Sequence, residues 1–135
     1  MNHLKLLIAS SILVVLPGCA LIDAYFMAGN DNQEYALINT IRTNAELNVG
    51  MCENYEASKK TFEYLHSKGL EVKNFTQHIP DNTDSHKLAS NIYELTKQGR
   101  DAYFGPVSTT FCKLKLQQIV RASETAQKVI GSKPR

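Results

Sequence analysis

The chain has 135 residues, of which 43% are hydrophobic and 21% charged, with seven Gly, four Pro and a formal net charge of +2. This composition excludes collagen and low-complexity disorder, and a polytopic membrane protein is excluded because the single long apolar run is N-terminal. Because 15 Lys and Arg are nearly balanced by 13 Asp and Glu and form no block, nucleic-acid binding is not expected.

Residues 1–18 have the features of a lipoprotein signal peptide. Lys5 precedes an apolar stretch over residues 6–16, which is too short to cross a hydrocarbon core of about 30 Å at about 1.5 Å per residue. The stretch ends in Leu16-Pro17-Gly18-Cys19, which resembles the lipobox of bacterial lipoproteins. That resemblance implies cleavage before Cys19 and acylation of its sulfur and of the new N-terminus. The alternative is a secreted chain that is cleaved further on.

The residue after the lipidated cysteine indicates the destination. Ala20 stands where an Asp would resemble an inner-membrane retention signal, so we expect the lipoprotein sorting machinery to deliver the chain to the periplasmic face of the outer membrane. Two or more acyl chains, at about 0.8 kcal/mol per buried methylene, make dissociation negligible. Residues 19–30 then form a lipidated tether ahead of a helical domain over residues 31–135.

That domain is predicted to be all-α, a compact four-helix domain. The first helical region starts at Asp31 or Asn32, and Gly50 interrupts or bends its end. A second helix is expected from Met51 to Lys68, with Gly69 as its stop. Residues 69–83 are expected to be a connection, with near-alternating apolar residues that indicate an extended pass over the bundle. The apolar face of the first region consists of Tyr35, Ile38, Ile41, Ala45, Val49 and Cys52.

The third helix is expected to start at a cap, Asp84 or Ser85, and to end at residues 104–106. Its predicted apolar face consists of Leu88, Ile92, Leu95, Gly99 and Tyr103. Gly99 lowers helix propensity by about 1 kcal/mol relative to Ala, so we expect another backbone to approach there. The fourth helix is expected to start near Val107. Its predicted apolar face comprises Val107, Phe111, Leu114, Ile119, Ala122, Ala126 and Val129, with Cys112, Leu116 and Ile130 beside it.

Two cysteines remain when the lipidated Cys19 is set aside. Cys52 and Cys112 would lie in a compartment that oxidises thiols, so we expect them to form one disulfide; the alternative is two buried free thiols. Their separation of 60 positions excludes a CxxC redox motif. Closing a loop of this length restricts the unfolded chain by roughly 4 kcal/mol in the entropy model.

No motif in the sequence places a nucleophile beside a base, a phosphate in a glycine-rich loop or a metal between two ligands. The chain is therefore expected not to be an enzyme and to need no cofactor. His66, His78 and His86 are interpreted as surface or helix-capping residues rather than metal ligands. Residues 81–84 suggest a calcium loop only superficially, because the Gly and the distal Glu of an EF-hand are missing, so no metal is expected.

A partner groove is the remaining functional hypothesis. The third helix has Tyr93 and Phe104 beside its core face, and the first has Leu37, Leu47 and Met51 off its main face. Either a small bundle buries two flanks of each helix, or two neighbouring helices leave an apolar groove for a partner's amphipathic helix.

The chain resembles the type II secretion pilotins of the PulS–OutS kind over roughly residues 33–120. The likeness consists of the lipobox cysteine, a helical domain of about 100 residues, and one cysteine in its early part with another near the start of the last helix. It also includes a family-like order of Ile92, Tyr93, Leu95, Gly99, Pro106 and Cys112. The resemblance implies a chaperone that binds the C-terminal segment of an outer-membrane secretin and travels the lipoprotein sorting route with it.

This sequence departs from the family in its aromatic helix ends and in a basic last helix, which carries Lys113, Lys115, Arg121 and Lys128. The alternative is another periplasm-facing outer-membrane lipoprotein: an envelope-assembly factor, an entry-exclusion protein or an inhibitor of a periplasmic hydrolase. Such a protein would share every feature except the groove.

Overall fold

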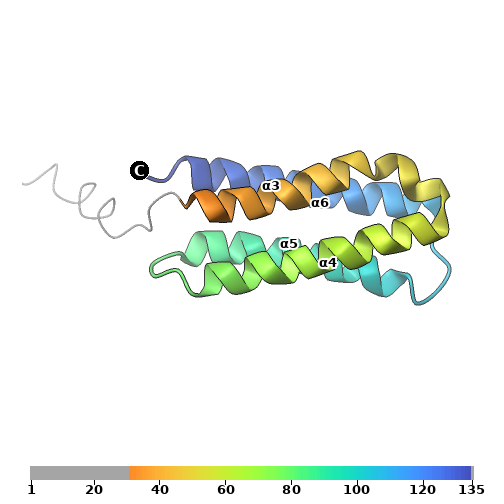
Figure 1. The fold of residues 1–135 in the computed structure, drawn as a ribbon, viewed down its shortest axis with the longest axis horizontal. Helices are drawn as coiled ribbons and strands as arrows, with labels where there is room; N and C mark the ends of the chain where they lie inside the picture. Colours follow the sequence, from red (N-terminus) through yellow and green to blue (C-terminus); the bar gives the residue numbers. More distant parts are fainter. Residues whose placement is uncertain (1–30, 135) are drawn as a thin grey trace, which may run out of the picture.

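Four long helices and one short 3-10 helix make up the domain in a computed structural model that describes residues 31–134 (Figure 1). This confirms the all-α prediction. The expected signal peptide, the lipidated Cys19 and the tether over residues 19–30 lie outside the described residues. The elements are α3 (Asn32–Leu47), η1 (Val49–Glu53), α4 (Tyr55–Gln77), α5 (Thr83–Ala102) and α6 (Thr109–Gly131).

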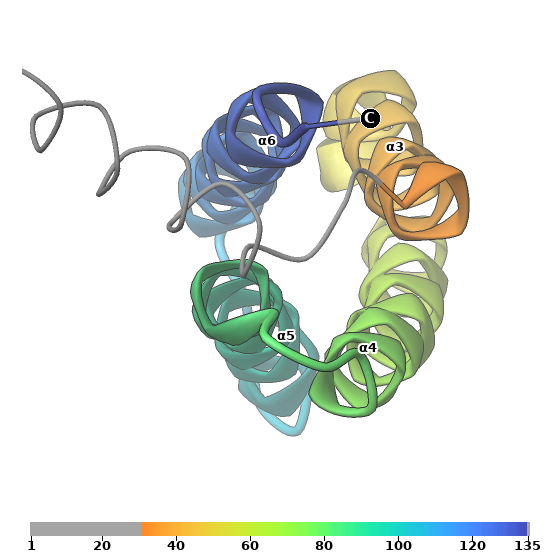
Figure 2. The same ribbon diagram turned by 90° about the vertical axis from the view of Figure 1, so that its left-hand side faces the viewer.

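Viewed along its long axis, the bundle has α3, α4, α5 and α6 at the corners of a square, in chain order (Figure 2). Each helix packs against the two beside it, so α3 lies diagonally opposite α5. One end, which we call the disulfide end, contains η1, the α5–α6 loop and the start of α6. Cys52 lies in η1 and Cys112 in the first turn of α6. The other, the polar end, contains the start of α3, the α4–α5 turn and the end of α6, with Glu34, Asn82 and Lys133.

The core is formed by side chains that recur at three- and four-residue spacing on each helix, as amphipathic helices require. Burying each large aliphatic or aromatic side chain stabilises the fold by about 1.5–3 kcal/mol. The largest fully buried apolar residues are Ile38, Ile41, Phe62, Leu65, Ile92, Leu116, Ile119 and Ile130.

The predicted stop at Gly69 is wrong, because α4 continues through this residue to Gln77. A Cβ at position 69 would lie 2.5 Å from Thr96 Oγ1 and 3.2 Å from the Cα of Tyr93 on α5. The glycine therefore permits close packing of two helices rather than ending one. The expected extended pass over residues 69–83 is also wrong, and the connection is reduced to residues 78–82, where Asp81 has a positive φ of 55°.

The predicted caps of α5 also differ from the structure. The N-cap is Asn82, and Asp84 and Ser85 lie inside the first turn. The Asn82 side chain makes no capping hydrogen bond, because its amide contacts Glu34 and Lys133 instead. At Gly99, an added Cβ would collide with the ring of Phe62, so a side chain fills the space where another backbone was expected.

α6 begins at Thr109, where the hydroxyl of the N-cap Ser108 accepts a hydrogen bond from the amide of Phe111. Its buried face is rotated from the predicted one: Leu114 is exposed, whereas Cys112, Leu116 and Ile130 are buried in the core. Cys112, which is bonded to Cys52, lies on this buried face. Cys52 and Cys112 are bonded and buried, with 5.7 Å between their Cα atoms, as predicted.

Candidate functional site

The five residues predicted to line a partner groove do not share one surface. Leu37 is half-buried and packs against the core, whereas Leu47, Met51 and Phe104 are exposed at the disulfide end, by 73%, 50% and 86%. Tyr93 lies on the α4–α5 side of the bundle. Since α3 and α5 are diagonally opposite, no groove between these two helices can join the five residues.

Tyr93 has contacts that explain it without a ligand. Its ring centroid lies 5.3 Å from that of His66, and the ammonium of Lys73 lies 4.4 Å from the ring centroid. A cation over an aromatic face is attracted to it. Tyr93 therefore joins α4 to α5.

Exposed apolar side chains gather at the disulfide end. Leu47 ends α3, Met51 lies in η1, and Phe104 lies in the α5–α6 loop. The loop itself is held in place, because the hydroxyl of Tyr55 donates to the carbonyl oxygen of Tyr103 at 2.9 Å and the two rings pack with centroids 5.2 Å apart. Phe104, the residue after Tyr103, is thus carried by an anchored loop.

An apolar depression lies between α5 and α6, and we call it the α5–α6 groove. Leu88, Leu95 and Ala122 form its floor and are half-buried against the core. Its volume is about 340 Å³. The rim consists of Asn91, Gln118, Arg121 and Thr125, all of them exposed.

The sequence did not predict this groove, because Leu88 and Leu95 fall on the predicted core face of the third helix and were therefore expected to be buried. They flank fully buried Ile92 on the side toward α6, where the small Ala122 leaves space. Arg121 makes no ion pair with any residue in 31–134. The groove therefore combines an apolar floor with one positive charge at its rim.

A second cleft, between α3 and α6, is polar and about 350 Å³ in volume. Two cations line it, Arg42 and the exposed Lys128. Arg42 is already engaged: its guanidinium lies 2.9 Å from Glu46, 3.4 Å from Glu124 and 3.1 Å from the amide oxygen of Gln127. The hydrogen bond to Glu46 raises the pKa of the Arg42 guanidinium. Because these contacts use its donors, Arg42 offers little to an anionic ligand.

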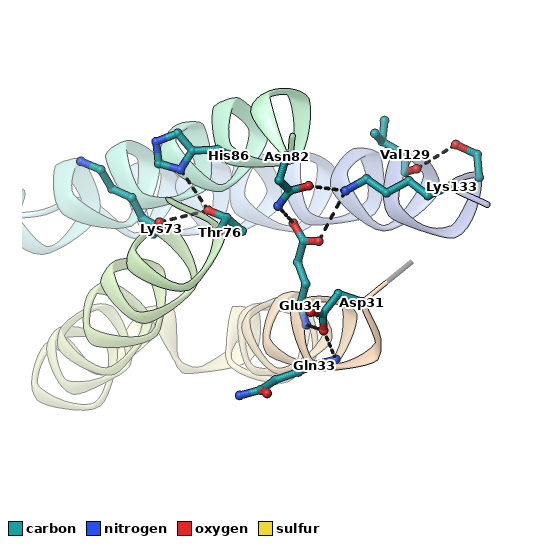
Figure 3. Close-up of polar contacts among 10 residues, drawn as sticks. Asp31, Gln33, Glu34, Lys73, Thr76, Asn82, His86, Val129 and Lys133 are labelled. Carbon is teal, nitrogen blue, oxygen red and sulfur yellow. Dashed lines mark hydrogen bonds and ion pairs between the residues drawn. The ribbon is translucent and has the colours of Figure 1, made fainter. Parts of the chain in front are cut away.

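At the polar end, three buried polar side chains contact one another (Figure 3). The ammonium of Lys133 donates to the amide oxygen of Asn82 and lies 3.6 Å from Glu34 Oε2. The amide nitrogen of Asn82 donates to Glu34 Oε1 at 3.3 Å. This Glu34–Asn82–Lys133 cluster joins the first turn of α3, the α4–α5 turn and the residues just after α6, so it serves to close the bundle.

The three histidines are separate. His86 Nδ1 lies 3.1 Å from the hydroxyl of Thr76 (Figure 3), His78 is exposed after α4, and His66 packs on Tyr93. Burial lowers the pKa of His66, and the nearby positive charge of Arg100 lowers it further. Across residues 31–134, His, Cys, Asp and Glu form no group of three that could hold a metal ion.

Comparison with known proteins identifies no relative. The chain matches no protein-family model, no curated protein sequence and no solved structure. Of the helices in the described part, none is long and apolar enough to cross a membrane.

Proposed function

We propose that this chain is a non-enzymatic, lipid-anchored pilot of the periplasmic face of the outer membrane, which binds the C-terminal segment of a secretin in the α5–α6 groove. The observation that supports this most is the groove itself. An apolar floor of Leu88, Leu95 and Ala122 between two neighbouring helices is what an amphipathic helix needs to bury its apolar face.

The disulfide supports the compartment in this proposal. Disulfides form and persist in oxidising environments, and Cys52–Cys112 closes the domain at one end. Together with the lipobox at residues 16–19, it favours a lipoprotein that folds after export. The resemblance to the type II secretion pilotins supplies the secretin as partner.

The test is a binding measurement between the mature chain and the C-terminal peptide of a secretin from the same host. A disordered peptide that orders in an apolar groove loses chain entropy and buries apolar area, so we expect micromolar or somewhat tighter affinity with a negative heat-capacity change. Salt should weaken binding only slightly, because the chain is nearly neutral.

Matched variants locate the site. Thr125→Trp places a large side chain in the α5–α6 groove from an exposed position, whereas Thr43→Trp makes the same change at an exposed position of α3. We expect the first variant to lose most of the binding and the second to retain it. Equal binding by both variants would place the partner elsewhere, and no binding by the unmodified chain would remove the pilot function.

Anchoring is tested separately by Cys19→Ser in cells. This variant should still bind the secretin segment, because residues 31–134 are unchanged, but should leave the secretin mislocalised. Normal secretin targeting without the lipid would contradict the proposal.

A further inference from the structure

The α5–α6 groove is an apolar surface for which the chain itself holds a candidate occupant. Leu88 and Leu95 remain half-exposed, although they face the same side as the fully buried Ile92. Exposed apolar patches with a polar rim commonly mark binding sites. A segment of the chain that covers the α5–α6 groove in the absence of a partner would bury these side chains.

The segment that precedes α3 has an unusual composition for a spacer. Eight of the eleven residues in 20–30 are apolar, and Asp23 is the one charged residue among them. A segment that only links an anchor to a domain is expected to be polar or rich in Gly and Ser. Leu21, Ile22, Tyr25 and Phe26 instead provide apolar side chains that favour burial.

The first turn of α3, where the described part of the chain begins, lies beside the turn that leads into α5. Glu34 lies within hydrogen-bond distance of Asn82, the residue directly before α5, so the chain enters the domain beside the start of α5. Leu88 lies about 9 Å along α5 from Asn82, and Leu95 about 20 Å, at about 1.5 Å per residue.

The length of the segment is sufficient to reach the groove. Eleven extended residues span at most about 36 Å, whereas crossing one helix takes about 10 Å and following the groove as far as Leu95 takes about 20 Å. Charge also agrees, because Asp23 is the one acid in the segment, and Arg121 at the rim has no ionic partner within residues 31–134.

We propose that residues 20–28 of this chain occupy the α5–α6 groove when no partner is bound, with the aromatic and aliphatic side chains over Leu88, Leu95 and Ala122 and with Asp23 near Arg121. A partner helix that enters the groove displaces the tether. This displacement rests on the proposed function, whereas occupancy of the groove by the tether does not.

The experiment places a photo-crosslinking amino acid at Phe26 in the full-length lipoprotein, expressed in the bacterial envelope. After irradiation, the crosslinked peptides are identified by mass spectrometry. We expect a crosslink within the same chain to peptides containing Leu88 to Leu95 or Gln118 to Thr125. Thr125→Trp should lower its yield severalfold, whereas Thr43→Trp should leave it unchanged.

Crosslinks to lipid, to a second copy, to another protein or to other faces of the bundle would each overturn the proposal, as would no crosslink at all. A far-UV circular dichroism spectrum of each variant reports that the bundle is folded. The readout is independent of the secretin: an intramolecular crosslink together with absent secretin binding removes the pilot function and keeps the tether in the groove. Secretin binding without the crosslink gives the opposite result.

Discussion

The two ends of the bundle are closed by different chemistry. At the disulfide end, a covalent bond joins η1 to α6, and the rings of Tyr55, Phe62 and Tyr103 pack beside it. At the polar end, the closure depends on three buried polar side chains, Glu34, Asn82 and Lys133. A disulfide acts mainly by restricting the unfolded chain, whereas a buried ion pair must offset its own desolvation in the folded state.

The two ends of the bundle therefore respond to different conditions. Reductant breaks the closure at the disulfide end, whereas loss of one charged side chain weakens the closure at the polar end. The disulfide end also carries Leu47, Met51 and Phe104, whose side chains are exposed and do not belong to the core.

Cys112→Ala has the largest expected effect. Removing the cross-link should lower the free energy of unfolding by roughly 4 kcal/mol, which lowers Tm by on the order of 20 °C for a domain of this size. The far-UV spectrum should stay helical at low temperature. Thermal unfolding followed by circular dichroism, with reduction of the unmodified chain as an independent route, checks this. A shift of only a few degrees would mean that the unfolded chain is already ordered in this loop.

Lys133→Met tests the polar end. It leaves the Glu34 carboxylate buried without its cation, so we expect a loss of about 3 kcal/mol, at the lower end for a broken buried pair because the last turn of α6 can open to water. The double variant Glu34→Gln/Lys133→Met should recover much of this loss in denaturant unfolding. Lys128→Met is the matched control, since Lys128 is exposed on α6 shortly before Lys133. Equal effects of the two lysine changes would remove the structural role of the cluster.

Gly99→Ala tests the aromatic packing beside the disulfide. The new methyl group meets the ring of Phe62, so overpacking of about 1–3 kcal/mol exceeds the gain in helix propensity of about 1 kcal/mol. We expect a net loss of about 1 kcal/mol in urea unfolding. Gly131→Ala, at the last residue of α6 near the polar end, meets no atom within 4 Å and should be neutral or slightly stabilising. Stabilisation by both changes would show that the ring of Phe62 moves aside freely.

The smallest expected effect is a pH dependence of the free energy of unfolding. It arises from His66, which lies within α4 between the two ends of the bundle. Burial lowers the pKa of His66, so the folded domain binds a proton at lower pH than the unfolded chain does. The free energy of unfolding should therefore be constant above about pH 7 and decrease as the pH falls below about 6.5, the ordinary histidine value. His66→Phe should reduce this decrease, and His78→Gln, at an exposed position, should not. Denaturant unfolding at several pH values measures it, and an unchanged slope in His66→Phe would contradict the assignment.

Short-range patterns in the sequence determined the class of fold and the covalent closure. The apolar spacing of residues such as Ile38 and Ile41 predicts helices, because burial of one face is a local requirement of any amphipathic helix. The pairing of Cys52 with Cys112 followed because two cysteines remain once the lipobox cysteine is assigned, and two cysteines allow one bond.

Only the tertiary structure decided the length of α4, the rotation of α6 and the position of the groove. Gly69 predicts a helix end by itself, but its missing side chain is what lets α5 approach, and that neighbour is not visible in the local sequence. Likewise, Leu88 and Leu95 have the same local pattern as core residues. They form a groove because α6 packs beside α5 and because Ala122, far along the chain, is too small to cover them. Which helices become neighbours depends on the packing of all four at once, and spacing within one helix carries no information about it.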